Sequence, residues 1–203
     1  MTKYNPDVYN NEWVAKRTRF HSKISKITNW FIKEYGPFES SLDLGAGDGW
    51  YSYILSTTGT DAYAVELHKW NLPYLPTKNV NCITYDLRKP LDLGRKFDLV
   101  LCIEVAEHLP ESVADILCDT VARHCGKLLV FTAALPGQGG KFHINEQPRQ
   151  YWKERLAKRG LIYSPKGTTH VSEGWKTILR GRMRWLYTNV MLYRFVENVR
   201  GSL

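Results

Sequence analysis

The sequence has no paired cysteine motif and no long apolar run. Its 203 residues include four cysteines, and no two of them form a C-x-x-C pair. This excludes a small disulfide-stapled scaffold and favours free thiols in a reducing compartment. No run approaches the roughly 18 apolar residues of a membrane span, and the polar N-terminus lacks the apolar stretch of a secretory signal. We therefore expect a cytoplasmic protein without a membrane span.

Low-complexity tracts and internal repeats are also missing, so disordered and solenoid classes are excluded. The composition, 43% apolar and 24% charged, is that of an ordinary globular domain. We expect a single domain over residues 1–203, with a helical arm over 1–38, a core over 39–135, and a loop, helix and final hairpin over 136–203. The net charge of +8 favours anionic partners.

Short apolar or β-branched runs alternate with helical patterns along the chain. The N-terminal helix is expected within residues 11–35, and the later helices over 49–57, 111–124 and 148–159. The expected strands are 41–44, 62–65, 80–85, 97–103, 127–132, 161–164 and 189–196. This order predicts an α/β fold with a parallel sheet and a closing antiparallel hairpin at one edge.

A glycine-rich turn follows the first expected strand, in the sequence Asp43-Leu44-Gly45-Ala46-Gly47-Asp48-Gly49. Glycine can take positive φ and has no Cβ, so such a turn leaves room for a nucleoside against the end of the strand. The spacing G-x-G-x-G differs from the dinucleotide fingerprint G-x-G-x-x-G, and the lysine motif of a P-loop is absent. The turn therefore predicts a nucleoside-binding site of another kind.

This turn resembles the first motif, D-x-G-x-G-x-G, of the class I S-adenosylmethionine (SAM) dependent methyltransferases. The resemblance continues in Asp61–Glu66, in Tyr85-Asp86-Leu87, and in the run from Phe97 through Glu104 to Pro110. It implies a Rossmann-like fold, with a seven-stranded, mostly parallel sheet whose last strand is reversed and which is flanked by helices. It also implies SAM as the cofactor.

The same resemblance implies which residues contact SAM. Glu66 would accept hydrogen bonds from the two ribose hydroxyls, a role that suits a carboxylate. Asp86 would lie near the adenine amino group. The full implied set is Asp43, Gly45, Ala46, Gly47, Gly49, Glu66, Leu67, Asp86, Leu87, Ile103 and Glu104.

Motifs of the base methyltransferases are missing after the fourth strand. No [N/D/S]-P-P-[Y/F/W] sequence occurs, which argues against amino-group methylation of adenine or cytosine. No cysteine follows a proline, which argues against C5 methylation. Cys102, inside the fourth strand, is expected to be a core residue.

Glu104, Glu107 and His108 occupy the acceptor end, and on the opening turn of a helix they would share one face. This E-x-x-E-H stretch is similar to one in ubiquinone-biosynthesis O-methyltransferases and in small-RNA 2′-O-methyltransferases. In the RNA enzymes these side chains and a later histidine hold a divalent ion. The similarity implies a catalytic and metal-binding set of Glu104, Glu107, His108 and His143, with Mg²⁺ or Mn²⁺ as the ion.

A metal at this position would lower the pKa of an acceptor hydroxyl and align its oxygen with the methyl group. The alternative is a metal-free site. There, His143 would be the general base, since an imidazole can take a proton at neutral pH.

The acceptor side is expected to come from the N-terminal arm and from the segments after the later strands. Candidate pocket residues there are Tyr4, Tyr9, Trp13, Gln138, Trp152, Trp175 and Trp185, and core packing is the alternative explanation for each of them. A basic group follows at Lys176, Arg180, Arg182 and Arg184. It is either a solvated helix face or a patch that contacts phosphate.

The leading functional hypothesis is O-methylation of a hydroxyl on a small molecule or saccharide. The first alternative is 2′-O-methylation of RNA, which the net charge favours but the lack of a separate RNA-binding module weakens. The second is a SAM-binding subunit without turnover. The sequence identifies neither the acceptor nor the oligomeric state.

Overall fold

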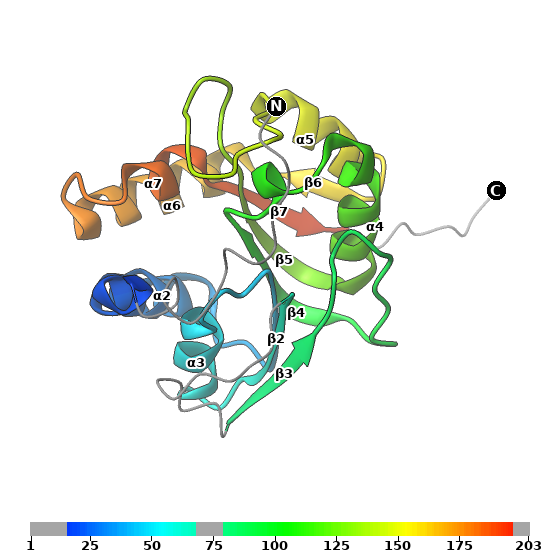
Figure 1. Ribbon diagram of the computed structural model, residues 1–203. Coiled ribbons are helices and arrows are strands. Elements are labelled where there is room, and N and C mark those ends of the chain that lie inside the picture. The colour runs from blue at the N-terminus through cyan, green and yellow to red at the C-terminus, as the bar shows by residue number, and fades with distance from the viewer. Residues whose placement is uncertain (1–15, 68–78, 197–203) are drawn as a thin grey trace.

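The computed structural model describes residues 16–67 and 79–196 (Figure 1). In these residues one seven-stranded sheet has the order β3-β2-β1-β4-β5-β7-β6. β7 is antiparallel to both of its neighbours, whereas the other strand pairs are parallel. The strands are β1 (Ser40–Leu44), β2 (Asp61–Glu66), β3 (Val80–Thr84), β4 (Phe97–Ile103), β5 (Cys125–Thr132), β6 (Leu161–Tyr163) and β7 (Met191–Phe195). The predicted α/β fold with a reversed last strand is confirmed.

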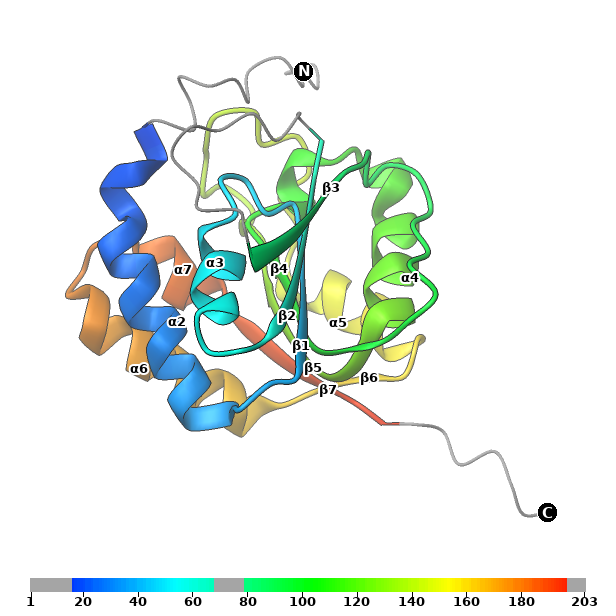
Figure 2. The same cartoon turned by 90° about the horizontal axis from the view of Figure 1, so that it is seen from below.

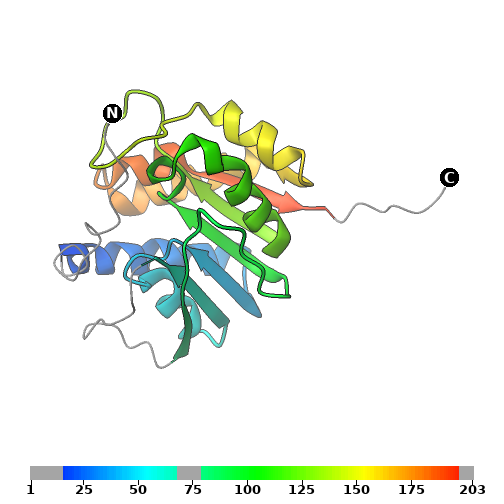
Figure 3. The same cartoon turned by 45° about the vertical axis from the view of Figure 1, so that its right-hand side comes forward.

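Helices cover both faces of the sheet, as the edge-on view in Figure 2 shows. α2, α3, α6 and α7 lie on one face, and α4 and α5 lie on the other. Figure 3 shows the sheet with β1–β3 toward one edge and β5–β7 toward the other. The helices are α2 (His21–Tyr35), α3 (Trp50–Ser56), α4 (Ala114–His124), α5 (Arg149–Ala157), α6 (Pro165–Leu179) and α7 (Arg184–Asn189).

The central strands are apolar on both sides because both faces are covered. In β4, Leu99 and Leu101 pack into the core beneath α2 and α6, while Val100 and Cys102 pack into the core on the α4 side. This alternation follows from the two-residue period of a strand. All four cysteines are free thiols, and Cys102 is buried as predicted. No helix in the described residues is long and apolar enough to cross a membrane.

The N-terminal arm forms α2, which buries Ile24, Ile27 and Phe31 at helical spacing. The helix ends at Gly36, where a Cβ would lie 2.6 Å from the Ile32 carbonyl oxygen. The described part of the predicted arm therefore contains this helix. Three of the candidate pocket residues, Tyr4, Tyr9 and Trp13, lie outside the described residues.

The basic C-terminal segment forms two helices before the last strand. Pro165 occupies the first turn of α6, and the Ser164 hydroxyl accepts a hydrogen bond from the Gly167 amide, which caps the helix. α7 then leads directly into β7. The expectation that Trp152 and Trp175 line an acceptor pocket is wrong: they are 1% and 2% exposed, because each packs into the core beside the sheet.

Candidate active site

A cavity opens where the sheet changes winding direction, between β1 and β4, at the carboxyl ends of the strands. Ligands of open α/β sheets bind at this kind of position. The wall includes most of the predicted SAM contacts, namely Gly45, Gly47, Glu66, Leu67, Asp86, Leu87, Ile103 and Glu104. Asp43, Ala46 and Gly49 are buried and do not line this cavity, so a direct ligand contact from these three stays a prediction.

The glycine turn needs glycine for both conformation and space. Gly45 and Gly47 have φ values of +73° and +61°, in the left-handed region that L-residues rarely adopt. A Cβ on Gly45 would also lie 2.5 Å from a methyl group of Val105. The turn can therefore pass close to the end of β4 and leave the cavity open.

Glu66 joins this turn to the end of β2. One of its carboxylate oxygens accepts a hydrogen bond from the Gly47 amide at 2.7 Å, and the other accepts from the Leu67 amide at 2.6 Å. A carboxylate oxygen has a second lone pair, so both oxygens remain able to accept from a ligand hydroxyl. The carboxylate is thus fixed on the cavity wall.

Asp43 lies beneath the turn rather than on the cavity. Its side chain is buried, and the Ser52 hydroxyl of α3 donates a hydrogen bond to it at 3.4 Å. Burial raises the pKa of Asp43 to about 7. On the other side of the cavity, Asp86 pairs with Arg88 at 2.7 Å, and these hydrogen bonds lower the pKa of Asp86.

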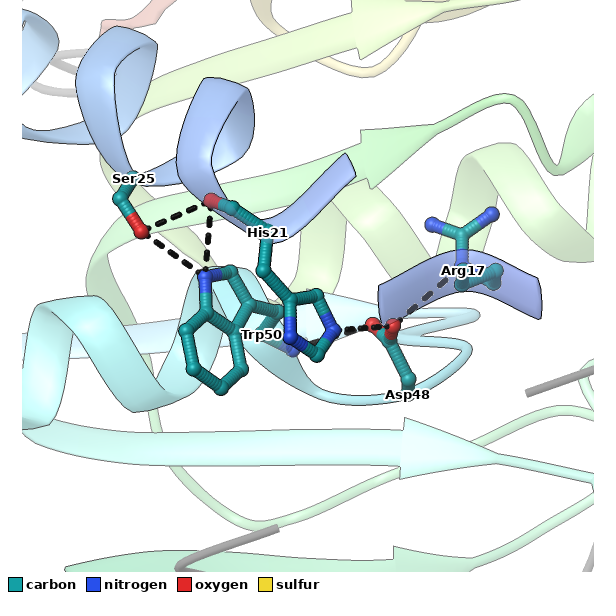
Figure 4. A network of polar contacts seen from close by, with 5 residues as sticks. All are labelled: Arg17, His21, Ser25, Asp48 and Trp50. Carbon is teal, nitrogen blue, oxygen red and sulfur yellow. Dashed lines mark hydrogen bonds and ion pairs between the residues drawn. The ribbon is translucent and has the colours of Figure 1, made fainter. Parts of the chain in front are cut away.

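Asp48 of the glycine turn holds the N-terminal arm (Figure 4). Its carboxylate lies 2.9 Å from His21 Nε2 and 3.7 Å from Arg17 Nε. The His21 ring stacks on Trp50 with a centroid distance of 3.7 Å, and the Trp50 indole N–H donates to Ser25 Oγ at 2.9 Å. This network brings Arg17 onto the wall of the first cavity.

Local sequence patterns did not indicate Arg17 or Asp48 as residues of this site. Arg17 and His21 lie about thirty residues before Asp48 in the chain, and spacing rules for helices and strands do not predict contacts over that separation. No partner for His21 could be recognised in the sequence. The only usable signal was an acid inside the glycine turn in a chain whose N-terminal arm is basic.

The segment after β4 corrects one prediction. Glu104, Glu107 and His108 do not share the opening turn of an α-helix, because Glu104 has a φ of +55° and only Ala106–His108 form a short 3₁₀ turn. The Glu104 amide is held by the carbonyl and the hydroxyl of Thr132 in β5. This contact turns the chain at the end of β4, and α4 begins only at Ala114.

The fold nevertheless gathers three of the four predicted residues. Glu107, His108 and His143 each offer a ligand atom, and these atoms lie within 4.8 Å of one another. The two imidazole rings are 5.0 Å apart in an edge-to-face arrangement. Glu104 lies beside this group, with its Oε1 accepting a hydrogen bond from Asn189 at 3.3 Å.

Glu107 is a buried carboxyl group with unusual surroundings. Neither of its oxygens has a hydrogen-bond partner in the described residues. Burial and the nearby carboxylate of Glu104 raise its pKa well above the ordinary value, while burial lowers the pKa of His108 to about 4. A neutral imidazole next to a buried carboxyl group with no partner is an arrangement that a bound cation would satisfy.

His143 is oriented by the carboxylate of Glu146, which no sequence motif had indicated. Its Nδ1 lies 2.9 Å from Glu146 Oε1, and Glu146 Oε2 accepts a hydrogen bond from the Gly137 amide at 2.9 Å. An Nδ1–H that donates to Glu146 leaves Nε2 with a lone pair. The signal was present as a Glu three residues after the His, within a loop.

A second cavity of about 490 Å³ adjoins the first, and Glu104 lies on the wall of both. The loop after β5 contributes His143 and Gln138 to its wall. α7, which lies about 40 residues later in the chain, contributes Arg184, Trp185 and Thr188 to the same wall. The loop and α7 lie near each other in Figure 1 and Figure 3.

Residues 15–166 match the model of a protein family described as a methyltransferase domain. The chain belongs to this family. The match covers the glycine turn, the acid of β2, the E-x-x-E-H stretch and the loop with His143, so the predicted methyltransferase is confirmed. No curated protein matches the sequence.

Solved methyltransferases share the fold at low sequence identity. The sugar N-methyltransferase KedS8 from Streptoalloteichus superposes with a TM-score of 0.68 at 16% identity, over 97% of this chain and 96% of that one. Magnesium protoporphyrin IX methyltransferase from Synechocystis, with bound SAM, gives 0.60 at 18% identity, over 90% and 84%. The 1,6-didemethyltoxoflavin-N1-methyltransferase from Burkholderia thailandensis, with bound 1,6-didemethyltoxoflavin and S-adenosylhomocysteine, gives a TM-score of 0.61 at 14% identity, over 97% and 93%. The fold is that of the class I SAM-dependent methyltransferases.

Proposed function

We propose that this methyltransferase binds SAM in the first cavity and transfers the methyl group to a hydroxyl of a small molecule or saccharide in the second. The position of Glu104 on both walls carries this proposal, because it places the two ligands next to each other. The fold relatives crystallised with SAM or S-adenosylhomocysteine support the same choice of cofactor.

The first cavity offers groups suited to each part of SAM. The Glu66 carboxylate would accept the ribose hydroxyls, and Asp86 and Leu87, on the same wall, would contact the adenine. Arg17 is the only arginine or lysine among the described residues on this wall, and it would pair with the carboxylate of the methionine part.

The second cavity suits a polar, ring-shaped acceptor. Its wall combines hydrogen-bonding side chains, such as Gln138 and Thr188, with the exposed indole of Trp185. An aromatic face with polar groups around it is typical of sites for hydroxylated rings. A sugar N-methyltransferase among the fold relatives is consistent with a saccharide.

Methyl transfer requires an acceptor oxygen in line with the methyl–sulfur bond. SAM supplies the methyl group on a positively charged sulfur, which leaves as the neutral thioether when the new O–CH₃ bond forms. His143 Nε2 takes the hydroxyl proton, and Glu146 stabilises the imidazolium that results. The glycine turn and Glu104 hold the two reactants in position, which supplies much of the rate acceleration.

The metal-assisted alternative rests on the cluster of Glu107, His108 and His143. The three side chains fit a divalent ion, because the Glu107 carboxyl group is buried without a partner. Two imidazoles with one carboxylate suit Mn²⁺ better than Mg²⁺, which prefers oxygen ligands. An ion there would lower the pKa of the acceptor hydroxyl.

Incubation with methyl-labelled SAM and an extract of the source organism tests the proposal. RNA, protein and small-molecule or glycan fractions are separated, and label is counted in each with and without EDTA. We expect label in the small-molecule or glycan fraction, and its loss with His143→Ala at unchanged SAM affinity. Label in RNA alone, or no transfer at all, would replace the proposal with one of the two alternatives. Loss with EDTA would assign the metal.

A further inference from the structure

We infer that the acceptor carries a negatively charged group, a phosphate or a carboxylate, which binds Arg184 while its ring stacks on Trp185. This inference rests on the proposed function and names the substrate class for the second cavity. It is carried by the way in which α7 presents its side chains to that cavity.

α7 divides its residues cleanly between the core and the cavity. Leu186, Tyr187 and Asn189 are buried, whereas Arg184 and Trp185 are exposed. Trp185 keeps 40% of its surface exposed, although large aromatic side chains normally bury far more. An indole left open on the wall of a cavity is available to stack on a ligand ring.

Arg184 has the properties of a ligand-binding cation rather than of a structural one. It is the only lysine or arginine among the described residues on the wall of this cavity, and no described acid pairs with it. By contrast, Arg159 pairs with Asp115 and Asp119, and Arg149 donates to the carbonyls of Thr188 and Val190. An unpaired guanidinium favours an anionic ligand group, because charge-assisted hydrogen bonds to carboxylate or phosphate are strong.

The helix that carries Arg184 is held firmly in place. Arg149 binds its C-terminal carbonyls, and the Ser172 hydroxyl donates to the Tyr187 carbonyl at 2.6 Å. Met183, just before α7, adopts a φ of +50°, which is costly for a residue with a side chain. Glu104, on the wall of this cavity, also has a positive φ, of +55°. The contacts of Arg149 and Ser172 therefore fix the helix that carries Arg184.

The charges on the wall would also fix the orientation of such an acceptor. Glu104 borders the SAM cavity and repels an anionic group, whereas Arg184 attracts it. An acceptor bound through its anionic group at Arg184 therefore presents a neutral hydroxyl toward Glu104 and His143. The same arrangement discriminates against uncharged analogues of the acceptor.

The test uses methyl-labelled SAM, a small-molecule extract of the source organism and anion-exchange separation of the labelled product. We expect the product to be retained by the exchanger. Treatment of the extract with phosphatase before the assay separates the two chemistries: labelling is lost if the group is a phosphate and persists if it is a carboxylate.

Arg184→Gln is compared with Arg182→Gln, an exposed neighbour that does not line the cavity. Arg184→Gln should raise the KM for the purified acceptor fraction about 10-fold or more, at unchanged kcat and SAM affinity. It should also remove the salt dependence of KM, and Arg182→Gln should match the parent. A labelled product that passes through the exchanger, or equal KM values, would overturn the inference and leave the proposed function intact. No labelled small molecule or glycan would overturn both.

Discussion

His143 and Glu146 form a carboxylate–imidazole pair, with 2.9 Å between Nδ1 and Oε1. The second oxygen of Glu146 is fixed by the Gly137 amide, so the carboxylate cannot swing away. The hydrogen bonds from His143 and from the Gly137 and Gly139 amides hold the pKa of Glu146 below its ordinary value, although burial acts to raise it. The loop after β5 therefore carries a carboxylate that would stabilise a protonated His143 in the proposed transfer.

Replacing this partner should slow transfer without affecting the cofactor. In Glu146→Gln the amide oxygen can still accept from His143, but the negative charge is gone. We expect kcat to fall about 10- to 100-fold, because a neutral amide stabilises an imidazolium less. Steady-state kinetics measure this. An unchanged kcat would assign Glu146 to loop structure alone.

Gly140 also determines the position of the His143 ring, because it packs directly against it. A Cβ there would lie 2.3 Å from the His143 ring, so Gly140→Ala must displace the imidazole. We expect a loss of kcat of at least 10-fold at unchanged SAM affinity, measured by kinetics and calorimetry. Gly139→Ala is the matched control: it adds strain at a positive φ but meets no atom within 4 Å, so its kcat should stay closer to that of the parent. Equal effects would indicate a general disturbance of the loop.

The cofactor cavity depends on Glu66 and on the glycine turn. Glu66→Ala removes the acceptor of the Gly47 and Leu67 amides as well as the proposed ribose contact. SAM affinity in calorimetry should drop by about 10- to 100-fold. Gly47→Val should abolish binding, because valine does not tolerate the φ of +61°. If either variant bound SAM with the affinity of the parent, the SAM site would have to lie elsewhere.

The attachment of the N-terminal arm depends on Asp48. Asp48→Ala leaves His21 Nε2 and Arg17 without this carboxylate, and we expect about 2 kcal/mol less unfolding free energy and weaker SAM binding. Denaturant titration and calorimetry measure the two effects. The control is Glu34→Gln on α2, the helix that also carries His21. It removes an exposed ion pair with His170 of α6 and should lower the unfolding free energy by under about 0.5 kcal/mol. Similar values for both variants would contradict a special role for Asp48.

Asp43 should make stability depend on pH. Its pKa is about 7 in the folded protein and about 4 when unfolded, so the folded state binds the proton more tightly. The stabilising contribution is therefore complete below pH 4 and is lost as pH rises toward 7. Asparagine does not titrate, so Asp43→Asn does not show this loss. The difference in unfolding free energy, variant minus parent, should therefore rise by about 3 kcal/mol between pH 4.5 and 7.5. Parallel pH profiles of the two proteins would refute the raised pKa.

Much of the fold follows from local sequence. Apolar runs such as Phe97–Ile103 form the expected buried strands, because a strand covered on both faces needs apolar side chains throughout. The glycines at 45 and 47 mark the cofactor turn, since only glycine takes these backbone angles at little cost. The family resemblance added the role of Glu66, which the structure places on the cavity wall.

The acceptor side was decided by tertiary structure. The spacing of Glu104, Glu107 and His108 predicted a shared helical face, but hydrogen bonds to Thr132, in a strand distant in sequence, turn the chain instead. His143 meets Glu107 and His108 across about 35 residues, and α7 brings Arg184 and Trp185 to the same cavity from more than 40 residues further along. Local patterns encode backbone conformation, whereas a site assembled from separate loops depends on how the whole sheet packs its helices and connections.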